Sequence, residues 1–367
     1  MYKPLSKKGD GENMRKIKVG VIGAGSISDM HFEAYKANEN VKIAAVCDLN
    51  ERRAREKAEY YGANQYYTDY NELLSVQEID AVSICTWNNS HAEISTAALN
   101  AGKHVLVEKP LCKTVDEALE IERAVREVDD QVLQVGFVRR HGTNAQVLKK
   151  FIDADDFGDI YYAKASYIRA LGNPGGWFAD KARSGGGPLI DLGVHVIDLA
   201  WYLMGKPKVT SVSGNTYSRL GNRSHIEHKS FYKAADYDPD QNTVEDMFNA
   251  LIRFENGASM MVDASFSLHT KRDTGELKLF GEKAGAEIDP QLHITTEKHH
   301  TILNVTPEID ASSFDMMSGF QNEIDHFITC VKGEADTIAP VEDGVEIMKV
   351  LAAIYESSET GKEVYLR

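Results

Sequence analysis

The sequence predicts an α/β Rossmann domain, a doubly wound parallel sheet, followed by an α+β domain with a large, mostly antiparallel open sheet. Up to about residue 138, short β-branched apolar runs alternate with helical patterns, which is typical of βαβ units. After about residue 150, long half-alternating strands follow one another with few helices between them. A chain of 367 residues also has the length of two domains.

Three segments follow from this division. We expect a loose N-terminal tail over residues 1–15 and a dinucleotide-binding domain over residues 16–138. Residues 139–367 are expected to form a domain for substrate binding and oligomerisation, whose last segment can pack back on the first domain.

In the first domain, five apolar runs predict strands, namely Ile17–Ile22, Val41–Val46, Ala81–Thr86, His104–Glu108 and Val132–Phe137. Four stretches between them have helical patterns, namely Ile27–Ala37, Glu51–Tyr61, about Ser90–Ala101 and Asp116–Val128. Gly62 and Gly102 stand where helices commonly end in a left-handed cap. Strand and helix therefore alternate throughout this part of the chain.

In the second domain, five runs predict longer strands, namely Asp159–Arg169, Lys208–Ser218, Phe248–Phe254, Ala258–Leu268 and Glu276–Phe280. Asn256–Gly257 predicts a hairpin turn between the third and the fourth. Two helices are expected, one from Pro188 to about Met204 and one over Val341–Glu359.

Composition excludes several classes of function. The chain has 41 Lys+Arg and 56 Asp+Glu, a net charge of −15, which disfavours nucleic acid and anionic membrane surfaces as partners. Its apolar runs are too short to span a bilayer, and the polar, basic start lacks the apolar stretch of a secretory signal. The four cysteines show no CxxC pairing, so we expect free thiols in a reducing cytoplasm and no metal site.

The first motif with chemical meaning is the glycine loop after the first strand. It reads Gly23-x-Gly25-x-x-Ser28 and opens a helix. The first glycine permits a tight turn, and the second lets a pyrophosphate approach the backbone. Amides of Ser26 and Ile27, at the start of the helix, can bind phosphate.

Asp48 follows the second strand, 20 residues after Ser28. A carboxylate there accepts hydrogen bonds from the adenosine ribose and repels a 2′-phosphate, so NAD is favoured as cofactor. The neighbouring Arg52 and Arg53 leave NADP open, since an arginine can hold the 2′-phosphate. Alternatively, Asp48 is a turn residue and the arginines lie on a solvated helix face.

Two further motifs carry candidate catalytic groups. Glu108-Lys109-Pro110 follows a strand, so Lys109 can offer a positive charge at the ligand crevice, unless it is a surface residue beside a turn. Asp191 and His195 lie four residues apart on one face of an apolar helix, and Asp198 could orient the imidazole. The alternative for this helix is a satisfied polar cluster in the core.

Taken together, these motifs resemble the glucose–fructose oxidoreductase/inositol dehydrogenase/rhizopine catabolism (Gfo/Idh/MocA) family. The resemblance rests on the glycine loop, Thr86-Trp87-Asn88-Asn89-Ser90-His91, Ala101–Pro110, Asp191-x-Gly193-x-His195 and the tail Phe320–Arg367. It implies NAD(P)-dependent oxidation of a secondary hydroxyl of a sugar, cyclitol or sugar derivative. The chain departs from the family pattern at Trp87, where proline is usual, and at Ser28.

The resemblance also implies roles for individual residues. Lys109, Asp191 and His195 match the family's catalytic triad. Asn88 and His91 match positions at the nicotinamide end of the cofactor site. Thr86 and Glu108 belong to the same two motifs and are expected to line the cofactor site as well. Arg140, in Gly136–Arg140, resembles a strand end that faces substrate. From the residues themselves, Trp177 and Arg183 offer the apolar face and the cationic donor that suit a polyol ring.

Two other functions remain open on this scaffold, namely a glycosidase that uses bound NAD for transient oxidation and a non-catalytic NAD-binding sensor. The intact Glu108-Lys109-Pro110 motif favours the dehydrogenase, and the full triad disfavours a sensor. We also expect a homodimer or homotetramer assembled through the open sheet, where Leu251, Met260, Val262 and Phe266 alternate between its faces. Arg253, Ser259 and Asp263 argue for the alternative, a polar outer face.

Overall fold

The N-terminal part of the chain forms the predicted parallel sheet. The computed structural model describes residues 15–366, so the predicted tail lies outside it except for Arg15. Six parallel strands lie in the order β3-β2-β1-β4-β5-β6, which confirms the doubly wound fold. The strands are β1 (Ile17–Ile22), β2 (Val41–Cys47), β3 (Gln65–Tyr67), β4 (Ala81–Ile84), β5 (His104–Glu108) and β6 (Leu133–Gly136).

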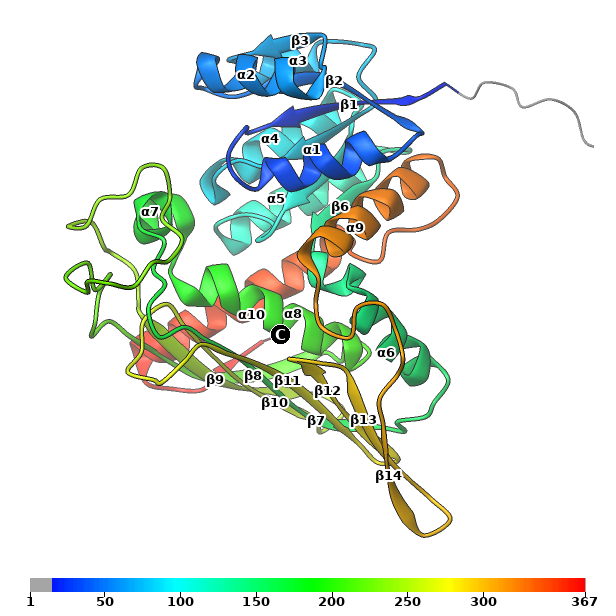
Figure 1. Cartoon of the computed structure of the whole chain (residues 1–367), viewed down its shortest axis with the longest axis vertical. Coiled ribbons are helices and arrows are strands. Elements are labelled where there is room, and N and C mark those ends of the chain that lie inside the picture. Colours follow the sequence, from blue (N-terminus) through cyan, green and yellow to red (C-terminus); the bar gives the residue numbers. More distant parts are fainter. Residues whose placement is uncertain (1–14, 367) are drawn as a thin grey trace, which may run out of the picture.

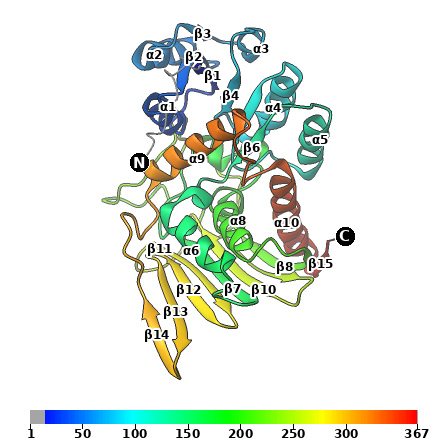
Figure 2. The same ribbon diagram turned by 90° about the vertical axis from the view of Figure 1, so that its right-hand side faces the viewer.

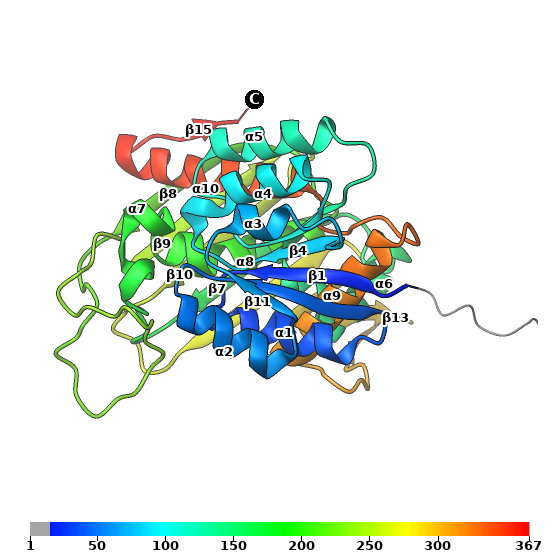
Figure 3. The ribbon, with the colours of Figure 1, turned by 90° about the horizontal axis from the view of Figure 1, so that it is seen from above.

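Helices cover both faces of this sheet, as Figure 3 shows from above. They are α1 (Ser28–Ala37), α2 (Glu51–Tyr61), α3 (Tyr70–Leu74), α4 (His91–Asn100) and α5 (Val115–Arg126). The predicted left-handed glycines are present, Gly62 after α2 with φ +71° and Gly102 after α4 with φ +73°. In addition, Thr114 and Glu117 form a capping box at the start of α5. The strand order reverses between β1 and β4, where doubly wound sheets bind ligands above their carboxyl ends.

The second sheet has nine strands in the order β14-β13-β12-β11-β7-β10-β9-β8-β15. They are β7 (Ile160–Ile168), β8 (Val209–Tyr217), β9 (Met247–Phe254), β10 (Ser259–Ser265), β11 (Thr274–Gly281), β12 (Ala284–Asp289), β13 (His293–Lys298), β14 (Thr301–Val305) and β15 (Val364–Tyr365). Neighbouring strands are antiparallel except for the parallel pair of β7 and β10. The mostly antiparallel sheet and the β9–β10 hairpin at Asn256–Gly257 are therefore confirmed.

Helices lie on one face of this sheet, between it and the Rossmann domain (Figures 1 and 2). They are α6 (Thr143–Asp153), α7 (Lys181–Ser184), α8 (Val194–Leu203) and α10 (Val341–Thr360), with short turns η2 (Val138–His141), η3 (Gly176–Ala179) and η4 (Leu189–Gly193). Two further elements belong with the first domain, namely the short turn η1 (Asn88–Ser90) after β4 and α9 (Met316–Val331). The C-terminal helices pack back on the first domain, since α9 contacts α1 and α10 contacts α5. Part of the chain's end thus closes the junction between the two sheets.

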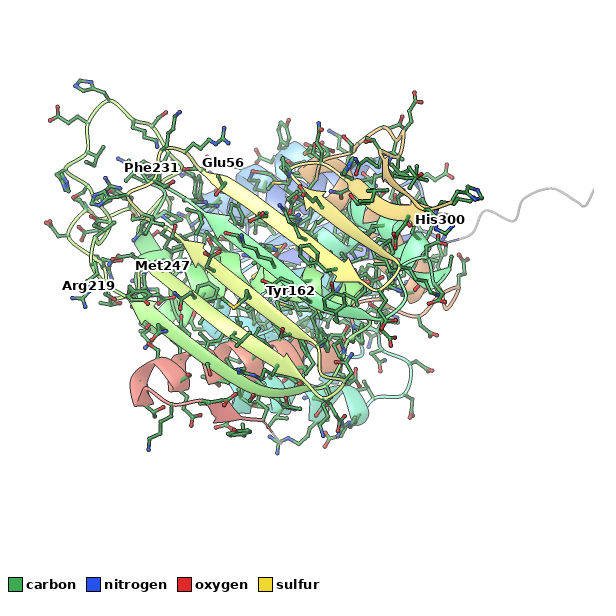
Figure 4. The ribbon with its side chains drawn as sticks, turned by 90° about the horizontal axis from the view of Figure 1, so that it is seen from below. Glu56, Tyr162, Arg219, Phe231, Met247 and His300 are labelled. Atoms are coloured by element: carbon green, nitrogen blue, oxygen red, sulfur yellow. The ribbon has the colours of Figure 1, made fainter. Side chains whose placement is uncertain are left out.

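The other face of the second sheet is open, and Figure 4 shows it with Tyr162 and Met247 upon it. Residues of β9 and β10 alternate as expected: Met260 and Val262 are buried beneath the helices, whereas Leu251 and Met261 pair on the open side. Phe280 pairs with Tyr162 there, and their rings stack 5.4 Å apart. Charged side chains share this face, as the ion pair of Lys164 and Glu276 at 2.9 Å shows.

Candidate active site

The glycine loop joins β1 to α1 as the sequence predicts. Gly23 has φ +92°, and a Cβ there would lie 2.5 Å from the carbonyl oxygen of Cys85, so only glycine fits this turn. At Gly25, by contrast, a Cβ would meet nothing within 4 Å. Open space above Gly25 is what a pyrophosphate needs in order to approach the backbone. The loop therefore fits a dinucleotide.

The start of α1 leaves donors for an anion. Ile27 is the N-cap residue and makes no side-chain capping bond. Over residues 15–366, the backbone N–H groups of Ser26 and Ile27 donate no hydrogen bond within the chain. These amides and the positive end of the helix dipole suit phosphate oxygens. The Tyr232 hydroxyl lies 3.4 Å from Ser26 Oγ, so a loop of the second domain reaches this point.

Asp48 lies beside the glycine loop. Its Oδ2 accepts a hydrogen bond from the Ala24 N–H at 2.8 Å, and its Oδ1 accepts one from the Asn50 N–H at 2.8 Å. Arg53 Nε lies 3.4 Å from Oδ1. The carboxylate is thus fixed at the end of β2, next to the phosphate loop. Arg53 pairs with Asp48 and so neutralises part of the charge that would repel a 2′-phosphate.

The loop after β4 brings Thr86, Asn88 and His91 to the same edge of the sheet. Asn88 is buried, and its Nδ2 donates to the Ser184 carbonyl at 2.8 Å, which links the two domains. His91 is buried between two backbone carbonyls, with Nδ1 2.9 Å from Pro110 O and Nε2 3.1 Å from Thr86 O. Burial lowers the pKa of His91. Its ring therefore ties the β4 and β5 loops together.

Glu108 is the last residue of β5, and its side chain is buried. Its Oε1 lies 2.9 Å from His31 Nε2, and its Oε2 accepts from the Lys109 N–H at 3.1 Å. His31 Nδ1 in turn lies 3.1 Å from Ser83 Oγ. Glu108, His31 and Ser83 are all buried. The carboxylate thus fixes the backbone at Lys109 through groups on α1 and β4.

Lys109 and Asp191 form an ion pair across the two domains. Lys109 Nζ donates to Asp191 Oδ1 at 2.9 Å and to the Asp191 carbonyl at 3.2 Å. Both side chains are about one-sixth exposed, at 16% each. Asp191 lies in η4, a π-turn that replaces the first part of the predicted helix. Such a turn re-aims side chains and is frequent at functional sites.

His195 lies in the first turn of α8, directly after this π-turn. Burial lowers its pKa well below the usual value, and the charges of Lys109, Arg139 and Arg169 lower it further. The imidazole is therefore neutral near pH 7 and can accept a proton. Its Nδ1 is sealed from solvent and has no partner within residues 15–366. Asp198 does not orient this ring, contrary to the sequence prediction.

Asp198 pairs instead with Arg140, which corrects the prediction that Arg140 faces substrate. Arg140 is fully buried and donates to Asp198 Oδ1 at 2.5 Å and to Asp198 Oδ2 at 3.0 Å. It also donates to Asp343 Oδ2 at 2.5 Å and to the Ile338 carbonyl at 2.6 Å. Arg140 thus joins η2, α8 and α10 in the interior, where no substrate reaches it.

Two other arginines, and not Arg140, act on His195. Arg139, its neighbour in sequence, and Arg169, just after β7, are the ones whose charges act on His195. Arg139 pairs with Asp289 at 2.6 Å. Arg169 donates to the Gly172 carbonyl at 3.3 Å. Of the two arginines in Gly136–Arg140, the one whose charge acts on His195 is thus Arg139, and no motif in the sequence singles out Arg169.

Trp177 and Arg183 lie in the segment that leads from β7 to the catalytic helix. Trp177 and Phe178 have ring centroids 4.0 Å apart, and Phe178 meets the Tyr232 ring edge-on at 6.5 Å. Arg183 lies over Trp87 at 4.8 Å and pairs with Asp180 at 3.1 Å and with Asp236 at 3.0 Å. Its charge is therefore balanced, and it holds loops of the two domains together.

Metal-binding groups and membrane-spanning helices are both absent from the described residues 15–366. Within the described part of the chain, no three His, Cys, Asp or Glu residues are grouped so that they could hold a metal ion. Among residues 15–366, no helix combines the length and apolar character needed to cross a membrane. The four cysteines are free and buried.

Comparison with known proteins adds independent evidence. Residues 17–137 match the model of the oxidoreductase family with an NAD-binding Rossmann fold (GFO_IDH_MocA), and residues 149–366 match its C-terminal alpha/beta domain. The chain is 33% identical over 353 residues to D-glucoside 3-dehydrogenase of Escherichia coli (strain K12), covering 95% of this chain and 97% of that protein. It is 29% identical over 360 residues to the scyllo-inositol 2-dehydrogenase (NAD(+)) of Bacillus subtilis (strain 168), covering 96% of each.

Solved structures agree on the fold. A levoglucosan dehydrogenase in complex with NADH and levoglucosan superposes with a TM-score of 0.83 at 23% identity, covering 96% of this chain and 99% of that one. The two family models together span nearly the whole described chain. The chain therefore belongs to the Gfo/Idh/MocA family of oxidoreductases, with an NAD-binding Rossmann domain and that family's C-terminal domain.

Proposed function

We propose that this chain oxidises a ring hydroxyl of a sugar or cyclitol, with NAD as the hydride acceptor, and that Lys109, Asp191 and His195 carry the reaction. The observation that supports this most is that the Lys109–Asp191 ion pair lies near the neutral, partly exposed imidazole of His195, whose pKa the Lys109 charge lowers. When bound, the nicotinamide supplies the site that accepts the hydride.

His195 acts as the general base. Its low pKa keeps the ring unprotonated, so it can take the hydroxyl proton as the carbon is oxidised. We assign this proton to Nε2, because Nδ1 is sealed from solvent. Lys109 then stabilises the negative charge that develops on the substrate oxygen. Asp191 holds the ammonium in place through its carboxylate and its backbone carbonyl.

The dinucleotide would be held by residues that the structure brings together at one edge of the sheet. Gly23 and Gly25 leave room for its phosphates, the Ser26 and Ile27 amides donate to them, and Asp48 accepts from the adenosine ribose. Thr86, Asn88, His91 and Glu108 shape the nicotinamide end. Tyr232 would close over the phosphates.

For substrate, we favour a D-glucoside over a free cyclitol. The 33% identical relative is named for that substrate, and the half-buried rings of Trp177 and Phe178 offer a flat apolar face to a pyranose. Formation of NADH should be followed with methyl glucosides, inositols and sugar acids. Release of an aglycone without net NADH would instead identify an NAD-dependent glycosidase, and tight NADH binding without turnover would identify a sensor.

We predict that NAD is used in preference to NADP, because the fixed Asp48 carboxylate repels a 2′-phosphate. The kcat/KM ratio should favour NAD by about tenfold or more, which corresponds to roughly 1.4 kcal/mol. Asp48→Ala should narrow that ratio, whereas Asp69→Ala, which alters a carboxylate at the cap of α3, should leave it unchanged. Equal use of NADP by the unaltered protein would contradict the assignment and point to Arg52 or Arg53.

A homodimer or homotetramer is the assembly we predict, built through the open face of the second sheet. Leu251, Met261 and Phe280 are at least partly exposed there without a helix over them, and two-fold association would bury them. Size exclusion with light scattering should give a mass of two or four chains, and Met261→Lys should lower it. A mass of one chain at micromolar concentration would refute the prediction.

The free and buried state of all four cysteines supports a reducing environment, so we place the protein in the cytoplasm. The excess of acidic residues speaks against nucleic acid as a partner. A small polyol or sugar remains the partner that the site suits.

A further inference from the structure

Glu245 is a buried carboxylate at the entrance to β9, far in sequence from the catalytic motifs. It is 6% exposed. The Gly187 N–H donates to both of its oxygens at 3.0 Å, and the Leu189 N–H donates to Oε1 at 3.2 Å. The Tyr355 hydroxyl, from α10, donates to Oε1 at 2.8 Å. The carboxylate of Glu245 is therefore held by three uncharged donors, namely two backbone N–H groups and one hydroxyl.

The glycines at residues 185–187 permit this arrangement by their small size. A Cβ on Gly186 would lie 1.8 Å from the Tyr355 hydroxyl oxygen, and one on Gly187 would lie 2.5 Å from the Glu245 carbonyl oxygen. Any larger residue would push α10 or β9 away. The glycine run thus serves close packing against Glu245 and Tyr355.

Backbone hydrogen bonds link Glu245 to the Lys109–Asp191 ion pair. Gly187 donates its N–H to Glu245, while its carbonyl accepts from the Ile190 and Asp191 N–H groups, each at 3.0 Å. The carbonyl and the carboxylate of Asp191 then both accept hydrogen bonds from Lys109 Nζ. Pro188 has no N–H to donate. The N–H groups of its two neighbours, Gly187 and Leu189, both donate to Glu245.

We propose that Glu245 is a positioning residue for the oxidation, fixing Gly187 and the π-turn so that Asp191 holds the Lys109 ammonium at the reacting oxygen. The proposal rests on the proposed function, because it takes Lys109 as the group that stabilises the oxyanion. Glu245 is assigned a positioning role because it is buried and both of its carboxylate oxygens accept hydrogen bonds from within the chain. Small misplacements of a catalytic group are sufficient to slow a reaction by about 100-fold.

Two variants separate the hydrogen bonds of Glu245 from its charge. Glu245→Ala should lower kcat by about 100-fold while the KM for NAD stays within about twofold. Glu245→Gln should recover at least about tenfold of that loss, because its amide oxygen can still accept at the Oε1 position. The primary deuterium isotope effect on kcat should rise in Glu245→Ala, since hydride transfer becomes slower than product release.

Asp80→Ala is the matched control. Asp80 also accepts a backbone N–H, that of Lys18 at 2.8 Å, but at the amino end of the Rossmann strands, away from the site. The Asp80→Ala variant should therefore have the kcat and the isotope effect of the unaltered protein. Crystal structures of the Glu245 variants give a readout independent of turnover: the Lys109 Nζ to Asp191 Oδ1 contact should lengthen in Glu245→Ala and return in Glu245→Gln.

Several outcomes would overturn the proposal. One is a kcat for Glu245→Ala near that of the unaltered protein, and another is an equal loss in both variants with the ion pair intact in their crystal structures. Failure of the proposed function is a different result, because the unaltered protein would then turn over no polyol. The crystal structures of the variants would still decide whether Glu245 positions Asp191.

Discussion

Lys109→Ala is expected to lower kcat by roughly 10³-fold while leaving the Kd for NAD nearly unchanged. In the proposed mechanism the ammonium stabilises the developing oxyanion, and removal of one such electrostatic group costs about 10²–10³ in rate. Asp191 would then stand as an uncompensated carboxylate in the pocket and oppose the same negative charge. Stopped-flow rates of NADH formation, with NAD binding from fluorescence titration, measure both quantities.

Lys149→Ala serves as the control for Lys109. Lys149 also pairs with a carboxylate, Asp153, but on the solvent side of α6, and its loss should leave kcat as it is. His195→Ala should lose about 10²-fold or more, as expected for a positioned base. Since burial and three cations depress the pKa of His195, the unaltered enzyme should keep its activity down to a pH well below 6.5. Near-normal kcat in either pocket variant would show that its role is assigned wrongly.

The Rossmann half was predictable because its signals are local. Each of the five predicted strands is a short, mainly apolar run rich in β-branched residues, and each helix has a glycine or a charged first turn to mark its limits. The short strand β3 and the helix α3 were missed because three to five residues give no measurable period. In the second domain, β12 to β14 and α9 were also not predicted. β13 is largely polar and β14 is exposed along its whole length, so neither has the alternation of buried and exposed residues that marks a strand.

Site residues, too, could be predicted only where a local motif contains them. Lys109, Asp191 and His195 stand in short motifs, so their meeting could be predicted once two domains were expected to face each other. Arg140 and Asp198 could not be placed, because either arginine of the pair Arg139–Arg140 fits the pattern and side-chain direction depends on the turn η2. Glu245 contacts Gly187, which lies 58 residues before it in the chain. That contact depends on how distant segments pack in the fold, so no local sequence pattern predicts it.

The Arg140 network supports the largest effect on stability that we expect. Arg140→Met would leave Asp198 and Asp343 buried without their guanidinium, and breaking a buried pair from one side costs about 3–5 kcal/mol. The free energy of unfolding should fall by that amount in denaturant titrations at pH 8. Arg253→Met removes a more exposed pair with Glu363 and should cost less than about 1 kcal/mol.

The loss should also depend on pH in a defined direction. Burial raises the pKa of Asp198 to about 6, even though Arg140 lowers it. A raised pKa means that the folded state holds the proton more tightly, so this contribution to stability is present in acid and is lost as the pH rises through about 6. Without Arg140 the pKa rises further, and the variant loses more stability than the unaltered protein between pH 5 and pH 8. The difference between the two proteins should therefore be smaller at pH 5, and a difference that is constant or larger in acid would show that Asp198 is not the group left uncompensated.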